Sequence, residues 1–396
     1  MYLTSDQLAK TFFDSKKFDL AAKQAEITVE LNNTDAILFN AARCHYYNRD
    51  ISMALKRINE AIEKNDRVID YWREKALYLT WNGEFDRSEK IIHQLPNEPK
   101  KIFNLGWHAI RKGNFLKGME LVEEGRKGRC WGNADLVLKT ERWQGQDVKG
   151  KTVLLISEAG LGDEMIFARF APMVADLGAK VHVRCTKTMV DLFKRLDKVH
   201  SVDQWPDMPE HDYWAPFMSL PAIMKLNSPY SKPYLTPNPD YINKWSKILG
   251  SGKKIAIRWQ GNPQFEQDQR RTLDPNILYD MAKQYGTIYS VQKESNIPCP
   301  SNVINLGDRL ETWEDTAAVL SLIDCVLTSC TSIPHLSGAL GAQTIIITPI
   351  VAYFTWGLPG EKSDWYDSVL IARQTNPYNW DDAYFQAEKH LRRVFI

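Results

Sequence analysis

The first 128 residues repeat one short pattern, and this repeat limits the possible folds more than any other feature of the sequence. Phe18, Ile51, Phe85 and Phe115 each stand where one amphipathic helical pattern ends and the next begins, and they are separated by 33, 34 and 30 residues. A period of this length is typical of arrays of helical hairpins, in which each hairpin buries its apolar face only by stacking on its neighbours. We therefore expect about four stacked hairpins in this part of the chain.

A different pattern begins after Trp143. From Lys151 onward, short β-branched runs alternate with amphipathic helical segments, as in parallel βαβ units. The predicted strands cover residues 153–157, 181–185, 213–217, 254–259, 288–292, 325–329 and 344–348. A proline-rich segment, 229–239, separates the first three strands from the last four, and we expect it to be a linker.

The two patterns together predict an α/β protein with three domains. Residues 1–130 are expected to form the helical repeats, closed by the glycines at 125 and 128. Residues 131–240 are expected to form an N-terminal Rossmann-like domain and residues 241–396 a C-terminal one. Ligands of such sheets bind at the carboxyl ends of the strands, so a cleft between the two facing domains is the expected site.

Charge and composition restrict the possible partners. A net charge of +1 gives no field that would hold nucleic acid or an anionic membrane non-specifically. No apolar run reaches the length of a membrane span, and the first residues lack the apolar core of a leader peptide. The six cysteines lie far apart without a CxxC pair, so neither a zinc site nor a disulfide framework is expected. These features predict a cytoplasmic protein. The 13 tryptophans and 16 tyrosines are expected to be mainly packing residues rather than sugar-binding ones.

The most informative motif lies where the first predicted strand ends. Residues 156–163 read Ile-Ser-Glu-Ala-Gly-Leu-Gly-Asp and lead directly into a helical pattern. Glu158, Gly160 and Gly162 would lie near the start of this helix, where bare N–H groups favour a polar or anionic ligand. Asp163 is either a helix cap, the commoner role for an aspartate in this place, or a carboxylate that faces the cleft.

A second motif follows the strand predicted at 325–329. Thr331 and Ser332 could offer hydroxyl and backbone N–H groups to a diphosphate at the start of a helix that has Pro334 in its first turn. His335 would lie on the same helix face. The alternative is that Ser332 is a simple N-cap and His335 a partly buried structural histidine.

A third motif runs from Arg258 to a pair of arginines. Arg258-Trp-Gln-Gly-Asn-Pro predicts a strand end and a turn that contains Asn262, and Arg271 follows within the same loop. Arginine suits phosphate because its guanidinium group makes two parallel hydrogen bonds. Arginines in loops are usually solvated, so this motif gains interest only from its expected proximity to Thr331.

These motifs carry a resemblance to a known family. Residues 142–163, 258–263, 328–341 and 363–374 resemble, in the same order, motifs of bacterial and phage tetratricopeptide-repeat glycosyltransferases. They are similar to the lipopolysaccharide heptosyltransferases of glycosyltransferase family 9 and, more distantly, to protein O-GlcNAc transferase. The resemblance covers nearly the whole chain. It implies a GT-B fold, a nucleotide-diphosphate sugar as co-substrate and an inverting, metal-independent reaction without a further cofactor. The absence of an Asp-x-Asp motif agrees with this.

The resemblance also implies roles for individual residues. Asp163 matches the aspartate that heptosyltransferases use as general base, and Glu158 is a reserve candidate for base or acceptor binding on the same loop. The chain has Cys330 where heptosyltransferases commonly have aspartate and O-GlcNAc transferase has histidine. The identity of the donor therefore cannot be copied from either family.

The same matching implies a donor site in the C-terminal half. Thr331 and Ser332 match the turn that binds the donor diphosphate, and Arg271 approximately matches a basic phosphate contact. Gln292 and Lys293 follow the strand whose end meets the nucleoside.

Other functions remain open at this point. The repeats could belong to a non-catalytic scaffold with a vestigial sugar-nucleotide module, whereas an epimerase or phosphorylase would leave the repeats without a role. A repeat array presents an extended surface, which suggests a macromolecular acceptor or a protein partner. A protein, a surface glycan and a modified base of phage DNA are all possible acceptors. The near-zero net charge argues mildly against DNA.

Overall fold

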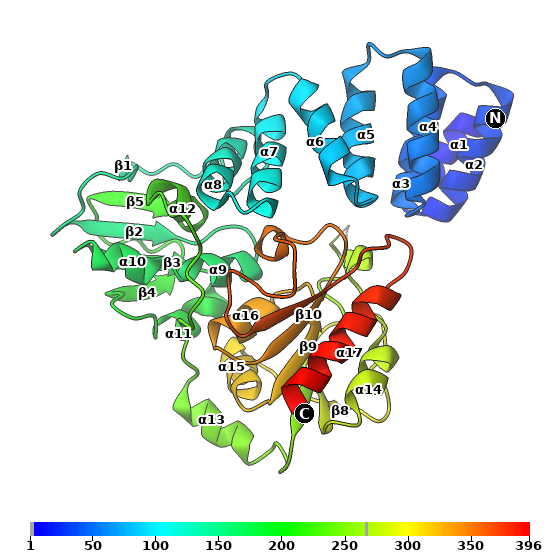
Figure 1. Cartoon of the computed structure of the whole chain (residues 1–396). Coiled ribbons are helices and arrows are strands. Elements are labelled where there is room, and N and C mark those ends of the chain that lie inside the picture. Colours follow the sequence, from blue (N-terminus) through cyan, green and yellow to red (C-terminus); the bar gives the residue numbers. More distant parts are fainter. Residues whose placement is uncertain (1–3, 266–267) are drawn as a thin grey trace.

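The computed structural model describes residues 4–265 and 268–396. Figure 1 shows an arm of helices, an α/β domain that follows it, and a second α/β domain that lies below the arm and beside the first. Both sheets are parallel throughout. The predicted fold class, two Rossmann-like domains in a GT-B arrangement after an all-α repeat region, is confirmed.

The arm consists of helix pairs whose turns lie where the repeat pattern predicted them. Phe18, Ile51, Phe85 and Phe115 are each the first residue of the second helix in a pair. The helices are α1 (Ser5–Asp14), α2 (Phe18–Leu31), α3 (Asp35–Tyr47), α4 (Ile51–Lys64), α5 (Ile69–Trp81), α6 (Phe85–Gln94), α7 (Pro99–Arg111) and α8 (Phe115–Glu124). Small buried side chains let neighbouring helices pack closely, among them Ala22, Ala41, Ala54 and Ala61. A short 3-10 helix, η1 (Gly125–Gly128), closes the last pair.

The first α/β domain is built on a five-stranded sheet with the strand order β1-β5-β2-β3-β4. Its strands are β1 (Glu141–Arg142), β2 (Thr152–Ile156), β3 (Lys180–Cys185), β4 (Ser201–Gln204) and β5 (Tyr213–Pro216). The connecting helices are α9 (Leu161–Ala168), α10 (Ala171–Asp176), α11 (Val190–Phe193) and α12 (Leu220–Ile223), with η2 (Lys187–Met189) and η3 (Phe217–Ser219). The central strand β2 is almost entirely buried, which explains its continuous apolar run.

The second α/β domain contains a six-stranded sheet with the order β11-β10-β9-β6-β7-β8. Its strands are β6 (Lys254–Arg258), β7 (Thr287–Ser290), β8 (Ile304–Asn305), β9 (Cys325–Ser329), β10 (Thr344–Thr348) and β11 (Val369–Arg373). Its helices are α13 (Pro239–Ser246), which follows the linker, α14 (Pro275–Ala282), α15 (Trp313–Ser321), α16 (Ile333–Ala339) and α17 (Asp381–Phe395), with η4 (Asp268–Arg270), η5 (Gly307–Arg309) and η6 (Phe354–Trp356).

Every strand predicted from the sequence is present, and β9 and β10 have the predicted bounds. The sequence missed β1, β4, β8 and β11, which are the outer strands of the two sheets. An outer strand pairs on one side only and is often short, so its apolar signal is weak.

Aromatic side chains form much of the junction between the three parts. Phe115 of the arm and Phe167 of α9 both pack against Trp365 of the second α/β domain, with ring centroids 5.5 and 6.3 Å apart. Trp131 contacts Phe167 and Phe354 at 5.9 and 5.5 Å. These rings are packing residues, as expected for most of the aromatic residues of the chain.

No helix within residues 4–265 and 268–396 combines the length and the apolar character that crossing a bilayer requires.

Candidate active site

A cleft of about 1160 Å³ lies between the two α/β domains. Its walls include the segments that follow β2, β6, β7 and β9, so it opens at the carboxyl ends of these parallel strands. Tyr241 of α13 also lines it. The volume is sufficient for a ligand of nucleotide size.

Most of the residues proposed from the sequence meet in this cleft. They are Gly160, Gly162, Asp163, Asn262, Arg271, Lys293, Thr331, Ser332 and His335. The two motif loops are in close contact, because a Cβ atom added to Gly162 would lie 3.5 Å from His335 Cδ2 and 3.7 Å from Ser332 Cα. The loop after β2 therefore lies directly against the turn after β9, and both line the cleft.

Asp163 combines both of the roles considered for it. It lies in the first turn of α9, where its Oδ2 accepts a hydrogen bond from the Gly160 backbone N–H at 3.1 Å. Its Oδ1 accepts a hydrogen bond from the hydroxyl of Tyr353, which belongs to the other domain. Burial raises the pKa of Asp163 above its ordinary value, and the hydrogen bonds from Tyr353 and Gly160 act in the opposite direction. Its raised pKa makes this carboxylate a stronger base than an exposed aspartate.

Tyr353 is a candidate site residue that none of the sequence motifs contains. It lies between β10 and η6 and lines the cleft. Burial and the adjacent charge of Asp163 raise the pKa of Tyr353 well above its ordinary value, so its hydroxyl keeps its proton and acts as a donor. The two partners are 190 residues apart in the sequence, and no local motif connects them.

Two arginines place positive charge on the wall formed by the second domain. Arg258 ends β6, and Arg271 donates through Nε to Asp268 Oδ1 and through Nη1 to the Cys330 carbonyl, both at 2.9 Å. Burial, and secondarily the charge of Arg271, lowers the pKa of Arg258 to about 10, so this group remains charged at neutral pH. Arg271 lies beside the turn that carries Thr331, and Arg258 lines the same cleft, so both could bind a diphosphate there.

The other donor-side residues have mixed roles. Thr331 Oγ1 accepts the Ile333 backbone N–H at 3.3 Å, and Ser332 is the N-cap residue of α16. The Asn262 side-chain oxygen accepts a backbone N–H two residues further on at 2.9 Å, which stabilises its turn. Lys293 is exposed where it lines the cleft, so its charge is available to a ligand.

His335 has the surroundings of a structural histidine, although it also lines the cleft. Its ring stacks on Trp356 with centroids 5.0 Å apart, and its Nδ1 lies 3.2 Å from the Tyr366 hydroxyl. Burial lowers the pKa of His335 to about 3, and this imidazole is therefore neutral at physiological pH. Its neutral ring can shape the cleft wall but adds no charge to it.

Two proposed site residues lie outside the cleft. Gln292 Oε1 accepts the backbone N–H groups of Trp259 and Gln260 at 3.2 and 3.0 Å, so the side chain joins the ends of β6 and β7. Glu158 is buried, and both of its oxygens bind the guanidinium group of Arg126 in the arm. The structure thus places neither side chain against a ligand in the cleft.

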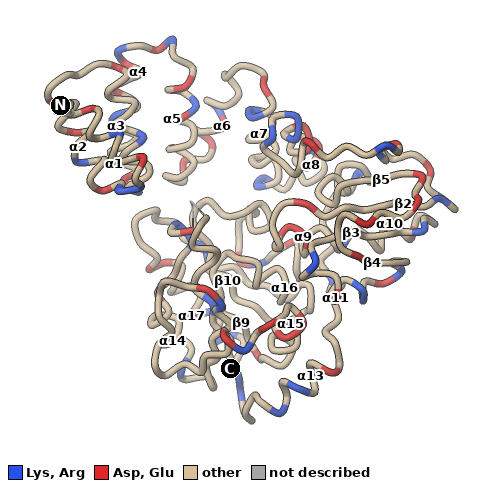
Figure 2. Tube along the Cα trace, turned by 180° about the vertical axis from the view of Figure 1, so that it is seen from behind, with Lys and Arg blue, Asp and Glu red and all other residues tan. Residues whose placement is uncertain are grey.

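Acidic and basic residues are interspersed over all three parts of the molecule (Figure 2), which agrees with the net charge of +1. Within the described ranges, no group of three or more histidine, cysteine, aspartate or glutamate side chains is arranged to hold a metal ion. All six cysteines are free thiols.

Comparison with known proteins gives distant likenesses. No family model matches the chain. Protein FlbA of Caulobacter vibrioides is 23% identical over 269 residues, which cover 58% of this chain and 44% of FlbA, so the chain spans less than half the length of this curated relative.

Among solved structures, the ADP-heptose lipopolysaccharide heptosyltransferase II of E. coli has a TM-score of 0.45 at 10% identity, over 62% of this chain and 98% of that one. A mutant O-GlcNAc transferase of Thermobaculum terrenum has a TM-score of 0.33 at 11% identity, over 100% of this chain and 94% of that one. These are the two kinds of protein that the sequence motifs resemble.

Proposed function

We propose that this protein is an inverting glycosyltransferase, which moves a sugar from a nucleoside-diphosphate donor to a hydroxyl group of a macromolecular acceptor. One observation carries the proposal: Asp163 of the first α/β domain and Arg258 and Arg271 of the second line the same cleft. A base for the acceptor hydroxyl and a cationic site for the departing diphosphate are the two elements that such a reaction needs.

In the proposed step, the acceptor oxygen attacks the anomeric carbon from the side opposite the diphosphate. A new C–O bond forms, the bond to the phosphate oxygen breaks, and its electron pair leaves with the diphosphate. The acceptor proton passes to Asp163 Oδ1. A carboxylate oxygen can accept more than one hydrogen bond, so the Tyr353 hydroxyl can stay in place. The configuration inverts because attack and departure occur on opposite faces.

Arg258 and Arg271 would stabilise the negative charge that grows on the diphosphate. In this proposal they take the role that a divalent cation has in other transferases, so the reaction needs no metal ion and no cofactor besides the nucleotide-sugar co-substrate. Lys293 could add a further contact to the nucleotide from the segment after β7.

The helical arm supports a macromolecular acceptor or protein partner. A groove of about 370 Å³ lies on its first helices, lined by apolar residues such as Phe13 and by charged ones such as Asp6, Lys10 and Arg43. Concave surfaces of stacked hairpins bind extended polymers. The same groove favours a second candidate function, a scaffold that binds a partner without catalysis.

A donor panel separates the two functions. We expect slow hydrolysis of one nucleoside-diphosphate sugar among UDP-, GDP- and ADP-linked sugars, measured by release of the nucleoside diphosphate. A CMP-linked sugar lacks the diphosphate and serves as the matched control, which should stay intact. Mass spectrometry of nucleotide that co-purifies with the protein would identify the base. If no donor is hydrolysed and no nucleotide binds, the scaffold function is correct.

Replacing Tyr353 with phenylalanine should move the acid limb of the kcat/KM profile to higher pH. The hydroxyl stabilises the ionised form of Asp163, so its loss lets burial raise the pKa of Asp163 further. The base then becomes protonated, and activity falls, at a higher pH than in the wild type. The pH profiles of the two proteins test this, with Tyr230→Phe, a change at an exposed linker residue, as control. An unchanged acid limb would show that the Tyr353 contact does not set the ionisation of the base.

A further inference from the structure

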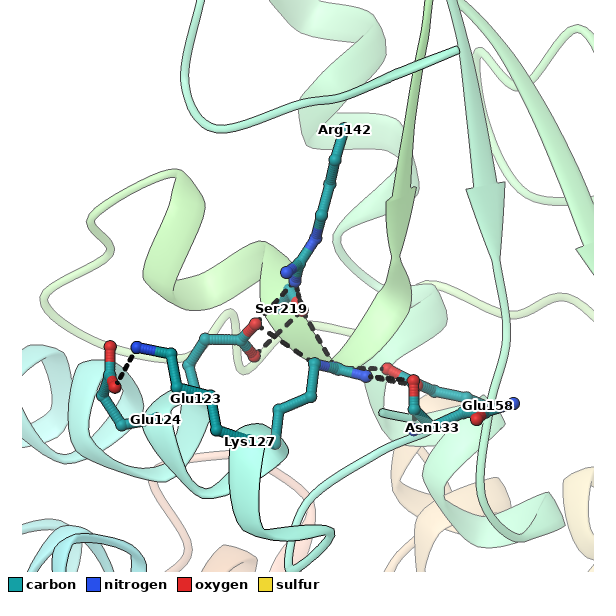
Figure 3. A network of polar contacts seen from close by, with 8 residues as sticks. Glu123, Glu124, Lys127, Asn133, Arg142, Glu158 and Ser219 are labelled. Atoms are coloured by element: carbon teal, nitrogen blue, oxygen red, sulfur yellow. Dashed lines mark hydrogen bonds and ion pairs between the residues drawn. The ribbon is translucent and has the colours of Figure 1, made fainter. Parts of the chain in front are cut away.

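A buried ion pair joins the helical arm to the loop that leads to Asp163 (Figure 3). Arg126 lies in η1 at the end of the arm, and Glu158 lies just after β2. The guanidinium group donates through Nη1 to Glu158 Oε2 and through Nη2 to Glu158 Oε1, each at 2.7 Å. Arg126 is 8% exposed and Glu158 is 7% exposed. A bidentate ion pair of this kind fixes the relative orientation of the guanidinium and carboxylate groups as well as their distance.

The backbone at Gly132 and Asn133 also contacts this ion pair. The Asn133 backbone N–H donates to Glu158 Oε2 at 2.5 Å, and Arg126 Nη1 donates to the Asn133 carbonyl at 3.2 Å. Gly132 has φ +59°, and a Cβ atom there would lie 2.5 Å from Arg126 Nη1. Only a glycine can bring the backbone this close to the guanidinium group in this conformation.

The second carboxylate of the cluster is that of Glu123, and it balances the positive charge of Arg142. Glu123 of α8 accepts from Arg126 Nε at 3.2 Å and from Arg142 Nη2 at 2.6 Å. The Ser219 hydroxyl donates to Glu123 at 2.9 Å and accepts from both arginines, at 3.0 Å from Arg126 and 2.8 Å from Arg142. The cluster thus joins the arm to three separate segments of the first α/β domain, which carry Arg142, Glu158 and Ser219.

The loop after Glu158 depends on its surroundings for its shape. Ala159 has φ +66°, in the left-handed region that a residue with a side chain seldom adopts. The next residue, Gly160, donates the backbone hydrogen bond that holds Asp163 Oδ2. A change in the position of Glu158 would therefore reach Asp163 through two intervening backbone units.

We propose that Arg126 and Glu158 are positioning residues: through their ion pair, the last repeat of the arm sets the conformation of the loop that presents Asp163 to the cleft. This inference rests on the proposed role of Asp163 as the base. It makes the arm a part of the catalytic unit, in addition to any surface it offers to a partner. It also replaces the role first considered for Glu158, that of a reserve base.

Two variants of the full chain test the inference. Glu158→Gln keeps the shape of the side chain but weakens the pair. The double change Arg126→Met with Glu158→Met removes both charges, and such apolar replacement of a buried pair is often neutral for stability. Arg142 still balances Glu123 in the double variant. Lys127→Met is the matched control, because it removes the exposed pair of Lys127 with Glu124 from the same turn.

In both test variants we expect amide hydrogen exchange to become about 10-fold faster in residues 157–163. Affinity for ADP and UDP, used as probes of the donor site, should stay within about twofold of wild type, while kcat falls about 10- to 100-fold because the base is misplaced. The double variant leaves the Asn133 backbone N–H and carbonyl without these two side-chain partners, so its melting temperature is recorded beside that of the wild type. A pair that only stabilises the fold would instead give normal exchange in residues 157–163 and a normal kcat, and its loss would be seen in the melting temperature alone.

Wild-type exchange in residues 157–163 of the double variant would overturn the inference, and so would faster exchange with unchanged kcat. The exchange measurement needs no turnover. If the wild-type protein hydrolysed no donor, the donor panel would reject the proposed function, whereas the exchange data would separately show whether the arm holds this loop.

Discussion

Replacing Asp163 with asparagine should lower kcat by about 10²- to 10⁴-fold, the usual contribution of a general base. The asparagine side chain has nearly the same shape, and its oxygen can still accept the Gly160 backbone N–H that caps α9. What it lacks is the ability to take a proton from the acceptor hydroxyl. Donor binding should change little, because the diphosphate contacts proposed here lie on the other wall of the cleft.

The measurement is single-turnover transfer or donor hydrolysis, together with calorimetric titration of ADP or UDP. Asp163→Ala should be equally inactive and, in addition, less stable by about 1 kcal/mol, because it also removes the acceptor for the backbone N–H of Gly160, the N-cap residue of α9. Asp176→Asn provides a control, since this aspartate is exposed on α10 and pairs with Lys198. Turnover by Asp163→Asn equal to that of the wild type would remove Asp163 from the mechanism and leave it as a cap.

Arg271→Ala should weaken binding of the nucleoside diphosphate by about 10- to 100-fold, which corresponds to the loss of a charge-assisted hydrogen bond worth about 1.5–3 kcal/mol. Arg271 lines the cleft beside Thr331 and is held there by Asp268 and the Cys330 carbonyl. Arg271→Lys keeps the charge without the planar fork, so its affinity should lie between those of the wild type and the alanine variant.

The alanine variant leaves the buried Asp268 carboxylate without its arginine, so its melting temperature must be recorded alongside the titration. Arg129→Ala serves as control, because this arginine is exposed at the end of the arm and pairs with Asp135. Equal affinities of the wild type and a folded Arg271→Ala variant would contradict a role in diphosphate binding.

Local sequence patterns were sufficient to predict much of the fold. The turn residues Phe18, Ile51, Phe85 and Phe115 begin helices because each ends one amphipathic pattern and starts another. The central strands were predicted from buried, β-branched runs such as the one at Cys325–Ser329. The outer strands were missed because a strand that pairs on one side only is often short and has a weak apolar pattern.

The sequence by itself thus determined the order of the elements and the loops that carry Asp163, Arg271 and Thr331, since strand ends and helix starts are encoded within a few residues. Only the tertiary structure decided which side chains those loops meet. The Tyr353 hydroxyl, from the other domain, donates a hydrogen bond to Asp163, and Arg126 of the arm binds the carboxylate of Glu158. Such contacts join residues that are far apart in the chain. They depend on how whole domains pack against each other, and this packing cannot be predicted from local sequence periodicity.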